Sequence, residues 1–292
     1  MVKNGQLPIR KIAYRSPADA PFGAEVMSFR QLRAMAEPAW RAAPQRPEFH
    51  VLGIVEQGTG HHTADFERYR LQPGSVLWIR PGQVHQLDGV ERVDGTLVLF
   101  QPDFLTPGTL AADLAADLFT PAGWDLDLRR DKLAMLALEH LRTEYVHGAG
   151  DPLAERTELL RQLITVLVLR ITPRPGTPPQ PHNDAFSLFR HAIERDFATN
   201  RQVSHYARQL GYSARTLSRA TLAATGAGAK EFIDARVLLE AKRLLAHGDL
   251  TVMQCAHQLG FHDAANFSKF FEQRAGLTPG AFRKSARGSG AP

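Results

Sequence analysis

Three histidines and one glutamate lie close together in the first third of the chain: His61, His62, Glu67 and His85. Imidazole nitrogens and carboxylate oxygens are common ligands of divalent metals in proteins. His61 and His62 are adjacent, however, and adjacent side chains on a strand point to opposite faces of a sheet. One ion cannot bind both histidines, so the set of ligands is one short. We therefore expect no metal and no cofactor here. The alternative role is hydrogen bonding to neighbouring loops or to a bound small molecule.

A second group of chemically active side chains occurs twice near the C-terminus. Arg215, Ser218 and Arg219 belong to the first occurrence, and Asn266 and Lys269 belong to the second. Such groups bind base edges and phosphates in the major groove of DNA. The plainer alternative is an ordinary helical bundle with a solvated polar face.

These side chains depend on a repeated motif for their positions. Segment 207–212 (ARQLGY) returns as 256–261 (AHQLGF), and segment 217–219 (LSR) returns as 267–269 (FSK). The offset grows from 49 to 50 residues between the two pairs, and the extra residue falls in a turn, where an insertion is tolerated. The chain therefore contains an internal repeat.

Each copy has the features of a helix-turn-helix. Gly211 or Gly260 can adopt a positive φ and end the first helix. Ser213 or Asp263 can then cap the second helix. The small residues at the helix crossing are Ala207 and Ala256, and the apolar residues expected to point inward are Leu217 and Phe267. The two copies predict two DNA-binding helices.

The distribution of charge supports a polyanionic partner. Residues 182–287 contain 15 Lys and Arg against 9 Asp and Glu, whereas the rest of the chain contains 20 against 21. The whole positive excess of the chain therefore lies in its C-terminal part, although a solvated basic surface would look the same.

Composition indicates a globular protein of two domains. The chain has 292 residues, of which 43% are hydrophobic and 22% charged. Its single cysteine, Cys255, cannot form an intrachain disulfide, which favours a cytoplasmic location. The first 20 residues show no apolar signal region, and the longest apolar run, 164–169, is too short to span a bilayer. We expect no membrane association.

Short β-like stretches occupy the N-terminal half, at 51–55, 67–71, 75–79 and 95–100. Glycines and prolines separate them, which is typical of a β-barrel or sandwich. The leucine pattern then predicts one helix near 131–148.

A second helix is predicted from about 151 to 171, with a wide apolar face. That face either packs on the barrel or forms a dimer interface, and both interpretations stay open. Residues 173–181 (PRPGTPPQP) follow as a semi-rigid linker. Phe186, Phe189, Ile193 and Phe197 then predict an amphipathic helix, and no later segment resembles a strand.

The second half of the C-terminal part carries a specific set of residues: Arg236, Leu239, Ala241, Leu244, Leu245, Val252, Ala256, Gly260, Phe261, Asn266, Phe267, Phe270, Phe271, Gly276, Thr278, Pro279, Phe282 and Arg283. With this set, residues 184–285 resemble the DNA-binding domain of the AraC/XylS family. The resemblance implies seven helices, with a long helix at about 230–246 joining the two helix-turn-helix units. It also implies that the residues contacting DNA are Arg215, Ser218, Arg219, Ala265, Asn266 and Lys269.

The chain departs from this family at two places. Ala220 and Thr221 stand where the family usually has an apolar residue and then phenylalanine, so looser or shifted packing is expected behind the first recognition helix. Cys255 stands where the family usually has isoleucine. We interpret it as a small buried hydrophobic residue rather than a redox sensor.

A second set of residues lies in the N-terminal half: Gly58, Gly60, Leu71, Gly74, Pro81, Gly82, Gln83, Val84, His85, Phe100, Phe104 and Leu105. With this set, residues 49–105 resemble the cupin-type sensor domain often joined to this DNA-binding domain. The resemblance implies a small-molecule effector in the barrel and a dimer formed by neighbouring helices. Candidate effector contacts are His50, His62, Trp78, Arg80 and His85. Metal-binding cupins carry a further histidine two positions before His62, where this chain has Gly60.

We therefore predict an α+β protein of two domains, with a cupin-like β-barrel and a helical segment followed by an all-α double helix-turn-helix domain. The predicted parts are residues 1–130 for the barrel, 131–172 for the dimerisation helices, 173–182 for the linker and 183–287 for the DNA-binding domain.

The predicted function is that of an effector-controlled, cytoplasmic, homodimeric transcription activator that binds double-stranded DNA and RNA polymerase. We expect it to have no enzymatic activity. Two other classes stay open: a metal-dependent cupin enzyme with an appended DNA-binding domain, and an architectural DNA-binding protein.

Overall fold

A computed structural model of the chain describes residues 10–15, 22–87, 89–117, 120–148, 152–173 and 184–288. The fold consists of two compact units, one containing the described residues up to 173 and the other the described residues from 184 onward. The predicted proline-rich linker, apart from Pro173, lies outside the described residues.

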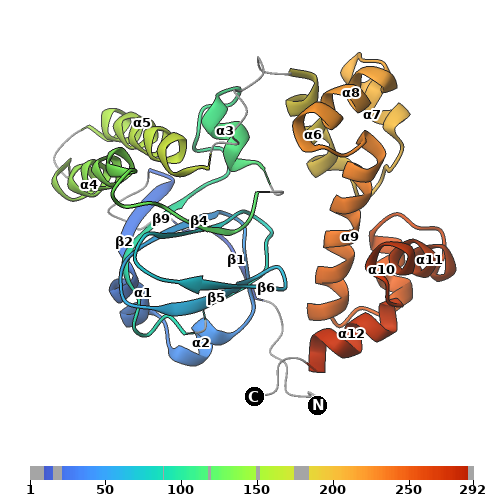
Figure 1. Cartoon of the computed structure of the whole chain (residues 1–292), viewed down its shortest axis with the longest axis horizontal. Helices are drawn as coiled ribbons and strands as arrows, with labels where there is room; N and C mark the ends of the chain where they lie inside the picture. Colours follow the sequence, from blue (N-terminus) through green and yellow to red (C-terminus); the bar gives the residue numbers. More distant parts are fainter. Residues whose placement is uncertain are drawn as a thin grey trace. The chain divides into compact units, whose positions relative to one another are not determined.

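In the described part of the N-terminal unit, ten strands form two five-stranded sheets (Figure 1). Sheet A contains, in order, β1 (Arg10–Ile12), β3 (Gln45–Pro47), β8 (His85–Gln86), β5 (Gly60–Ala64) and β6 (Glu67–Leu71). Sheet B contains, in order, β10 (Gly123–Asp125), β7 (Ser75–Ile79), β4 (His50–Gln57), β9 (Asp94–Phe100) and β2 (Ala24–Ser28). All four strands predicted from the sequence are confirmed, as parts or the whole of β4, β6, β7 and β9.

The two sheets do not close into a barrel. Among the described residues, no strand of sheet A pairs with a strand of sheet B. β1, β3 and β8 are only two or three residues long. Pro47 lies in β3 and Pro81 precedes β8, and proline cannot donate to a strand ladder. The predicted α+β class with two domains is confirmed, but the sheets of the N-terminal unit are open.

Sheet B is buried on both faces, because alternate residues of its central strands enter different cores. Leu52 and Ile54 of β4 belong to a core shared with the helices that follow the sheets. Val51 and Val55 belong to the other core, which includes Ala64 and Leu71 of sheet A. The first face is therefore covered by helices, and the second lies between the sheets.

Five helices complete the N-terminal unit in its described part. α1 (Phe29–Met35) and α2 (Pro38–Ala42) lie between β2 and β3 in the chain. α3 (Leu110–Ala115), α4 (Lys132–His147) and α5 (Leu153–Ile171) cover the helix side of sheet B (Figure 1). The sequence predicted α4 and α5, whereas it did not predict α1, α2 and α3.

The described C-terminal unit consists of seven helices: α6 (Asp184–Asp196), α7 (Val203–Leu210), α8 (Ala214–Thr225), α9 (Ala229–His247), α10 (Val252–Gln258), α11 (Ala264–Ala275) and α12 (Pro279–Gly288). α9 is the predicted long connecting helix, and it runs between the α6–α8 group and the α10–α11 group (Figure 1). Its core residues Ile233, Val237 and Ala241 are fully buried.

Charged side chains are also buried along α9. Arg236 pairs with Glu194 of α6 at 2.8 Å and with Glu240 at 3.2 Å, and Arg243 pairs with Glu240 at 3.3 Å. Asp234, which is 3% exposed, pairs with Arg274 of α11. These pairs tie α9 to helices on both sides, and losing one partner would leave an uncompensated buried charge.

Candidate nucleic-acid interface and sensor cores

The first helix-turn-helix unit is formed by α7 and α8. Gly211 ends α7 with φ of 73°, the left-handed conformation that favours glycine. The Ser213 hydroxyl accepts a hydrogen bond from the backbone N–H of Thr216 at 3.0 Å and so caps α8. Both roles agree with the sequence prediction.

α8 presents the predicted DNA-contacting residues on its surface. Arg215 and Arg219 are exposed and one helical turn apart, and Ser218 is half-buried. Leu217 points into the core and is fully buried. The exposed side of α8 therefore carries two guanidinium groups.

The departure at Ala220 and Thr221 does not leave a polar group unsatisfied. Both residues are buried, and the Thr221 hydroxyl donates to the Leu217 carbonyl oxygen at 2.8 Å. The hydroxyl thus bonds to the backbone of its own helix, while Leu222 is exposed.

The second helix-turn-helix unit is formed by α10 and α11. Gly260 has φ of 68°. The Asp263 carboxylate accepts from the backbone N–H of Asn266 at 2.7 Å. The side-chain amide of Asn266 also donates to Asp263, at 2.8 Å. This second bond holds Asn266 at the start of α11, with its amide oxygen still available as an acceptor.

The remaining predicted residues of α11 lie as expected for an exposed face. Ala265, Asn266 and Lys269 are exposed, and Phe267 is fully buried. Cys255 of α10 is buried, and this burial raises the pKa of its thiol. Cys255 is therefore a small core side chain, as predicted. A protonated thiol is a poor nucleophile, which does not suit a redox sensor.

A hollow of about 280 Å³ lies beside α11. Asn266 and Lys269 line it together with three basic residues that the sequence prediction missed, Arg201, His262 and Arg274. Arg201 comes from the loop before α7, so its place near α11 depends on tertiary contacts that no local pattern reveals.

Contacts around Arg201 join the loop before α7 to the second helix-turn-helix unit. Its guanidinium Cζ lies 3.5 Å from the centroid of the Phe261 ring, and Nη2 donates to the Gly260 carbonyl oxygen at 3.2 Å. A Cβ added to Gly260 would lie 2.3 Å from the carbonyl oxygen of Ala198. The loop before α7 therefore packs closely on the turn between α10 and α11.

The five candidate effector residues fall into two groups on different sides of sheet B. The first group is His50, Trp78 and Arg80. The His50 and Phe100 rings are stacked with their centroids 4.5 Å apart. Trp78 Nε1 donates a hydrogen bond to His50 Nδ1 at 3.3 Å. The Arg80 guanidinium lies 4.6 Å from the Trp78 ring. Because Trp78 and Phe100 belong to the core shared with α4 and α5, this group lies under the helices.

The second group is His62 and His85, on sheet A. Their ring centroids are 5.2 Å apart, and both residues are buried. His85 pairs in register with Ala64, which belongs to the core between the sheets. Among the described residues, both nitrogens of His62 and Nδ1 of His85 have no hydrogen-bond partner.

All three buried histidines of the N-terminal unit favour the neutral form. Burial lowers the pKa of His50 to about 3, and the nearby Arg80 adds to this effect. Burial lowers the pKa of His85 to about 4, although Asp65 acts in the opposite direction. The pKa of His62 is also well below its ordinary value, through burial and the proximity of His85.

Glu67 is separate from the histidine pair in its interactions. Its carboxylate accepts a hydrogen bond from the Tyr69 hydroxyl at 2.8 Å. Burial, together with this bond, raises the pKa of Tyr69 to about 12. In the described part of the chain, no three His, Cys, Asp or Glu side chains gather in a group that could hold a metal ion.

Two family models match the chain. One is described as an AraC-like ligand binding domain and matches residues 35–164. The other is described as a helix-turn-helix domain and matches residues 206–285.

Among the described helices, none combines the length and apolar character needed to cross a membrane.

Curated relatives include the HTH-type transcriptional activator RhaS of two Salmonella strains. The protein of Salmonella paratyphi A is 27% identical over 245 residues, covering 81% of this chain and 86% of the relative. The protein of Salmonella schwarzengrund is 27% identical over 246 residues, with the same coverage.

Solved structures with similarity include ToxT from Vibrio cholerae, with 14% identity and a TM-score of 0.41 over 82% of this chain and 89% of that one. Another is the C-terminal domain of the two-component response regulator yesN from Fusobacterium nucleatum. It is 24% identical, with a TM-score of 0.33 over 35% of this chain and 99% of that one.

Proposed function

The chain belongs to the AraC/XylS family of transcription regulators, and we propose that α8 and α11 read a specific DNA sequence under the control of an effector bound by the N-terminal unit. The C-terminal unit is a helix-turn-helix DNA-binding domain, and the N-terminal unit is an AraC-like ligand-binding domain. The proposed DNA-contacting residues are Arg215, Ser218, Arg219, Ala265, Asn266 and Lys269.

One observation carries the proposal for DNA: each unit displays a capped helix whose inward side is buried and whose outward side is polar. On α8 the buried residue is Leu217 and the outward ones are Arg215 and Arg219. On α11 the buried residue is Phe267 and an outward one is Lys269. A helix of this kind fits the major groove of B-DNA, where arginine pairs with guanine.

The basic hollow beside α11 supports a contact with the DNA backbone. Arg201 lies against the ring of Phe261 and contributes positive charge next to Lys269, whereas the charge of Arg274 is already paired with the buried Asp234. We assign Arg201 to phosphate binding, which positions a protein on DNA without reading its sequence.

For the effector we favour His62 and His85 over the other three candidates. His50, Trp78 and Arg80 bond or stack with one another inside the core under the helices. The histidine pair lies on the side between the sheets and has nitrogens without partners in the described chain. Buried polar atoms of this kind are suited to hydrogen bonding with a ligand.

We propose a homodimer that assembles through α5. Leu159 and Val166 are 40% and 43% exposed, and Leu163 between them is half-buried. These three residues follow the i, i+4, i+7 spacing of one helix face. The same helix buries Leu160, Ile164 and Leu167 against the rest of the unit, so α5 can serve both roles left open by the sequence.

The finer assignments of domain and cell biology are proposals too. We place the sensor at residues 1–130, the dimerisation helices at 131–172, the linker at 173–182 and the DNA-binding domain at 183–287. This division is supported by α4 beginning at Lys132 and α5 ending at Ile171. We further propose that the protein is a cytoplasmic activator that contacts RNA polymerase and has no catalytic activity.

Binding of the full-length protein to DNA selected from a random library tests the proposed interface. Arg219→Ala should weaken binding by about 1–3 kcal/mol and relax the preference at one base pair, because a guanidinium that grips a guanine edge discriminates among bases. Lys269→Ala should act in the same way at a base pair roughly one helical turn away.

Arg195→Ala is the matched control for charge. Arg195 is an exposed arginine of α6 that pairs with the neighbouring Asp196 at 2.9 Å. Its removal should leave sequence preference unchanged. A loss for Arg219→Ala that is uniform across all DNA sequences would make Arg219 a phosphate contact, and no loss at all would refute the assignment of α8.

A further inference from the structure

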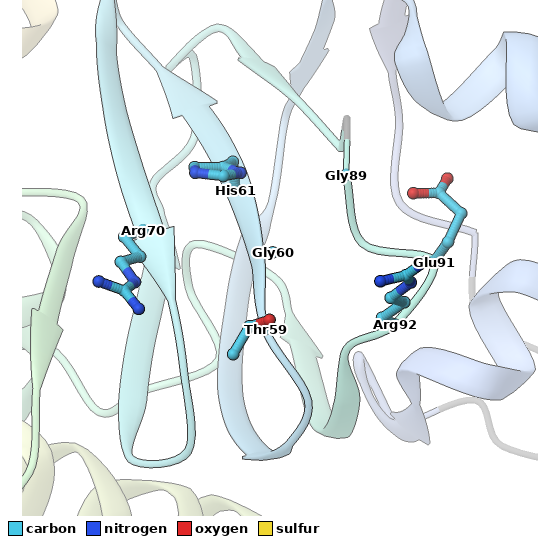
Figure 2. A pocket seen from close by; sticks show the side chains of 7 residues that line it. All are labelled: Thr59, Gly60, His61, Arg70, Gly89, Glu91 and Arg92. Atoms are coloured by element: carbon cyan, nitrogen blue, oxygen red, sulfur yellow. The ribbon is translucent and has the colours of Figure 1, made fainter.

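The N-terminal unit contains a second hollow that lies apart from the histidine pair. It has a volume of about 530 Å³, within the range of small-molecule sites. Figure 2 shows its lining from strands β5 and β6 on one side and the 89–92 segment on the other. The lining residues are Thr59, Gly60, His61, Arg70, Gly89, Glu91 and Arg92.

This hollow faces away from the core between the sheets. His61 is exposed, whereas its neighbour His62 is fully buried, because side chains alternate along β5. Arg70 of β6 pairs in register with His61, so the two lie on the same outer face. The hollow is therefore a different place from the proposed effector position at His62 and His85.

The lining carries an excess of positive charge. It includes two arginines, Arg70 and Arg92, and one histidine, with Glu91 as its one carboxylate. Glu91 accepts from Arg41 Nη1 at 3.4 Å, and the Arg41 side chain is only 5% exposed. The charge of Glu91 thus compensates a buried cation. No carboxylate among the described residues pairs with Arg70 or Arg92.

The backbone around the hollow is held in place by close contacts at glycines. A Cβ added to Gly60 would lie 2.1 Å from the Gly89 carbonyl oxygen, and one added to Gly58 would lie 1.6 Å from the Arg92 carbonyl oxygen. The turn before β5 therefore packs directly on the segment that follows β8. This packing gives a physical reason for the Gly58-x-Gly60 motif found in the sequence.

Arg33 of α1 holds the segment that carries Arg92. Its Nη1 donates to the Val90 carbonyl oxygen at 3.0 Å and to the Val93 carbonyl oxygen at 2.5 Å. The segment that carries Arg92 is thus fixed at two points before any ligand arrives. A site that is already ordered loses less conformational entropy on binding.

We propose that this hollow binds a small anionic ligand, one whose phosphate or carboxylate groups are attracted by the guanidinium groups of Arg70 and Arg92. Guanidinium groups match both anions in geometry and charge, and the Thr59 hydroxyl and the His61 imidazole add further donors. The sensor unit then has two ligand sites, one between the sheets and one on the outer face of β5 and β6.

Isothermal titration of the full chain with inorganic phosphate and, separately, with citrate tests the proposal and distinguishes the two anions. Arg70→Ala and Arg92→Ala should each weaken binding about tenfold or more, since each removes a charge-assisted contact. Both residues are exposed, so the variants should keep the natural melting temperature. In NMR spectra of the backbone amides, the ligand should shift the resonances of Gly60, His61 and Gly89.

Arg68→Ala is the matched control, because Arg68 is an exposed arginine on the same strand and face that does not line the hollow. The Arg68→Ala variant should bind each anion with the same affinity as the natural chain. Binding of one anion only would identify the ligand class. Absence of binding for both anions at about 10 mM, or an equal loss for Arg68→Ala, would overturn the proposal.

Discussion

His50, His62 and His85 are buried as neutral imidazoles, with pKa values that lie below the ordinary value for histidine. In the unfolded chain each would titrate near 6.5. As the pH falls below this value, the unfolded state takes up protons before the folded state does. Stability is therefore complete above about pH 6.5 and is lost as the pH falls toward the folded values of about 4 for His85 and about 3 for His50.

Urea unfolding followed by tryptophan fluorescence can measure this loss. The three tryptophans, Trp40, Trp78 and Trp124, all belong to the N-terminal unit, so the signal reports on that unit. Between pH 6.5 and 5.5 we expect the free energy of unfolding to fall by about 1 kcal/mol for each buried histidine. The double variant His62→Gln/His85→Gln should show a smaller fall. An equal fall would mean that other groups cause the acid sensitivity.

Sequence reasoning found these histidines but could not say which of them meet. Alternation along β4 and β7 predicts that His50 and Trp78 are inward, yet it does not say which side of sheet B each one faces. That depends on the helices α4 and α5, more than 80 residues later in the chain than His50. The pair at His62 and His85 likewise arises from the order of strands in sheet A.

The two turn glycines have the same role in the sequence repeat but different surroundings in the structure. Both have positive φ, 73° at Gly211 and 68° at Gly260. A Cβ at Gly211 would meet nothing within 4 Å, whereas one at Gly260 would collide with the Ala198 carbonyl oxygen. Two copies of one motif therefore differ in their tolerance of substitution.

Thermal unfolding followed by far-ultraviolet circular dichroism should separate the two glycines. Gly211→Ala should cost about 1–2 kcal/mol from backbone strain alone. Gly260→Ala should cost a further 1–3 kcal/mol or so, because the methyl group overpacks a contact made by backbone. Equal costs would mean that the loop at Ala198 moves aside freely.

Local sequence signals predicted the elements of the C-terminal unit well. Gly211, Ser213 and Asp263 act within a few residues of their own positions, so a pattern is enough to identify their roles. Arg201 could not be found in this way. Its partner Phe261 is 60 residues away along the chain and becomes a neighbour only when α9 brings the units together.

The arrangement of two copies of the chain is a property of the whole molecule. Leu159→Lys together with Val166→Lys should convert the proposed dimer into a monomer, because each lysine would have to be buried in an apolar interface. Sedimentation velocity measures the change. DNA binding should also weaken, since linked domains gain affinity from effective concentration.

Leu153→Lys is the control for this experiment. Leu153 is 51% exposed at the start of α5 but lies on a different side of the helix from Leu159 and Val166. The control should sediment as the natural chain does. A natural chain that sediments as a monomer, or a double variant that stays dimeric, would contradict the assignment of α5.

The close packing of Ala198 on Gly260, with Arg201 over Phe261, has a consequence for promoters. Inserting one base pair between the two sub-sites of an operator turns one of them roughly 35° around the duplex axis. Because the loop before α7 packs on the turn between α10 and α11, we expect α8 and α11 to keep their relative position, so the DNA itself must twist or bend to restore contact, at an elastic cost. Promoters served by this protein should therefore keep the separation of the two sub-sites constant.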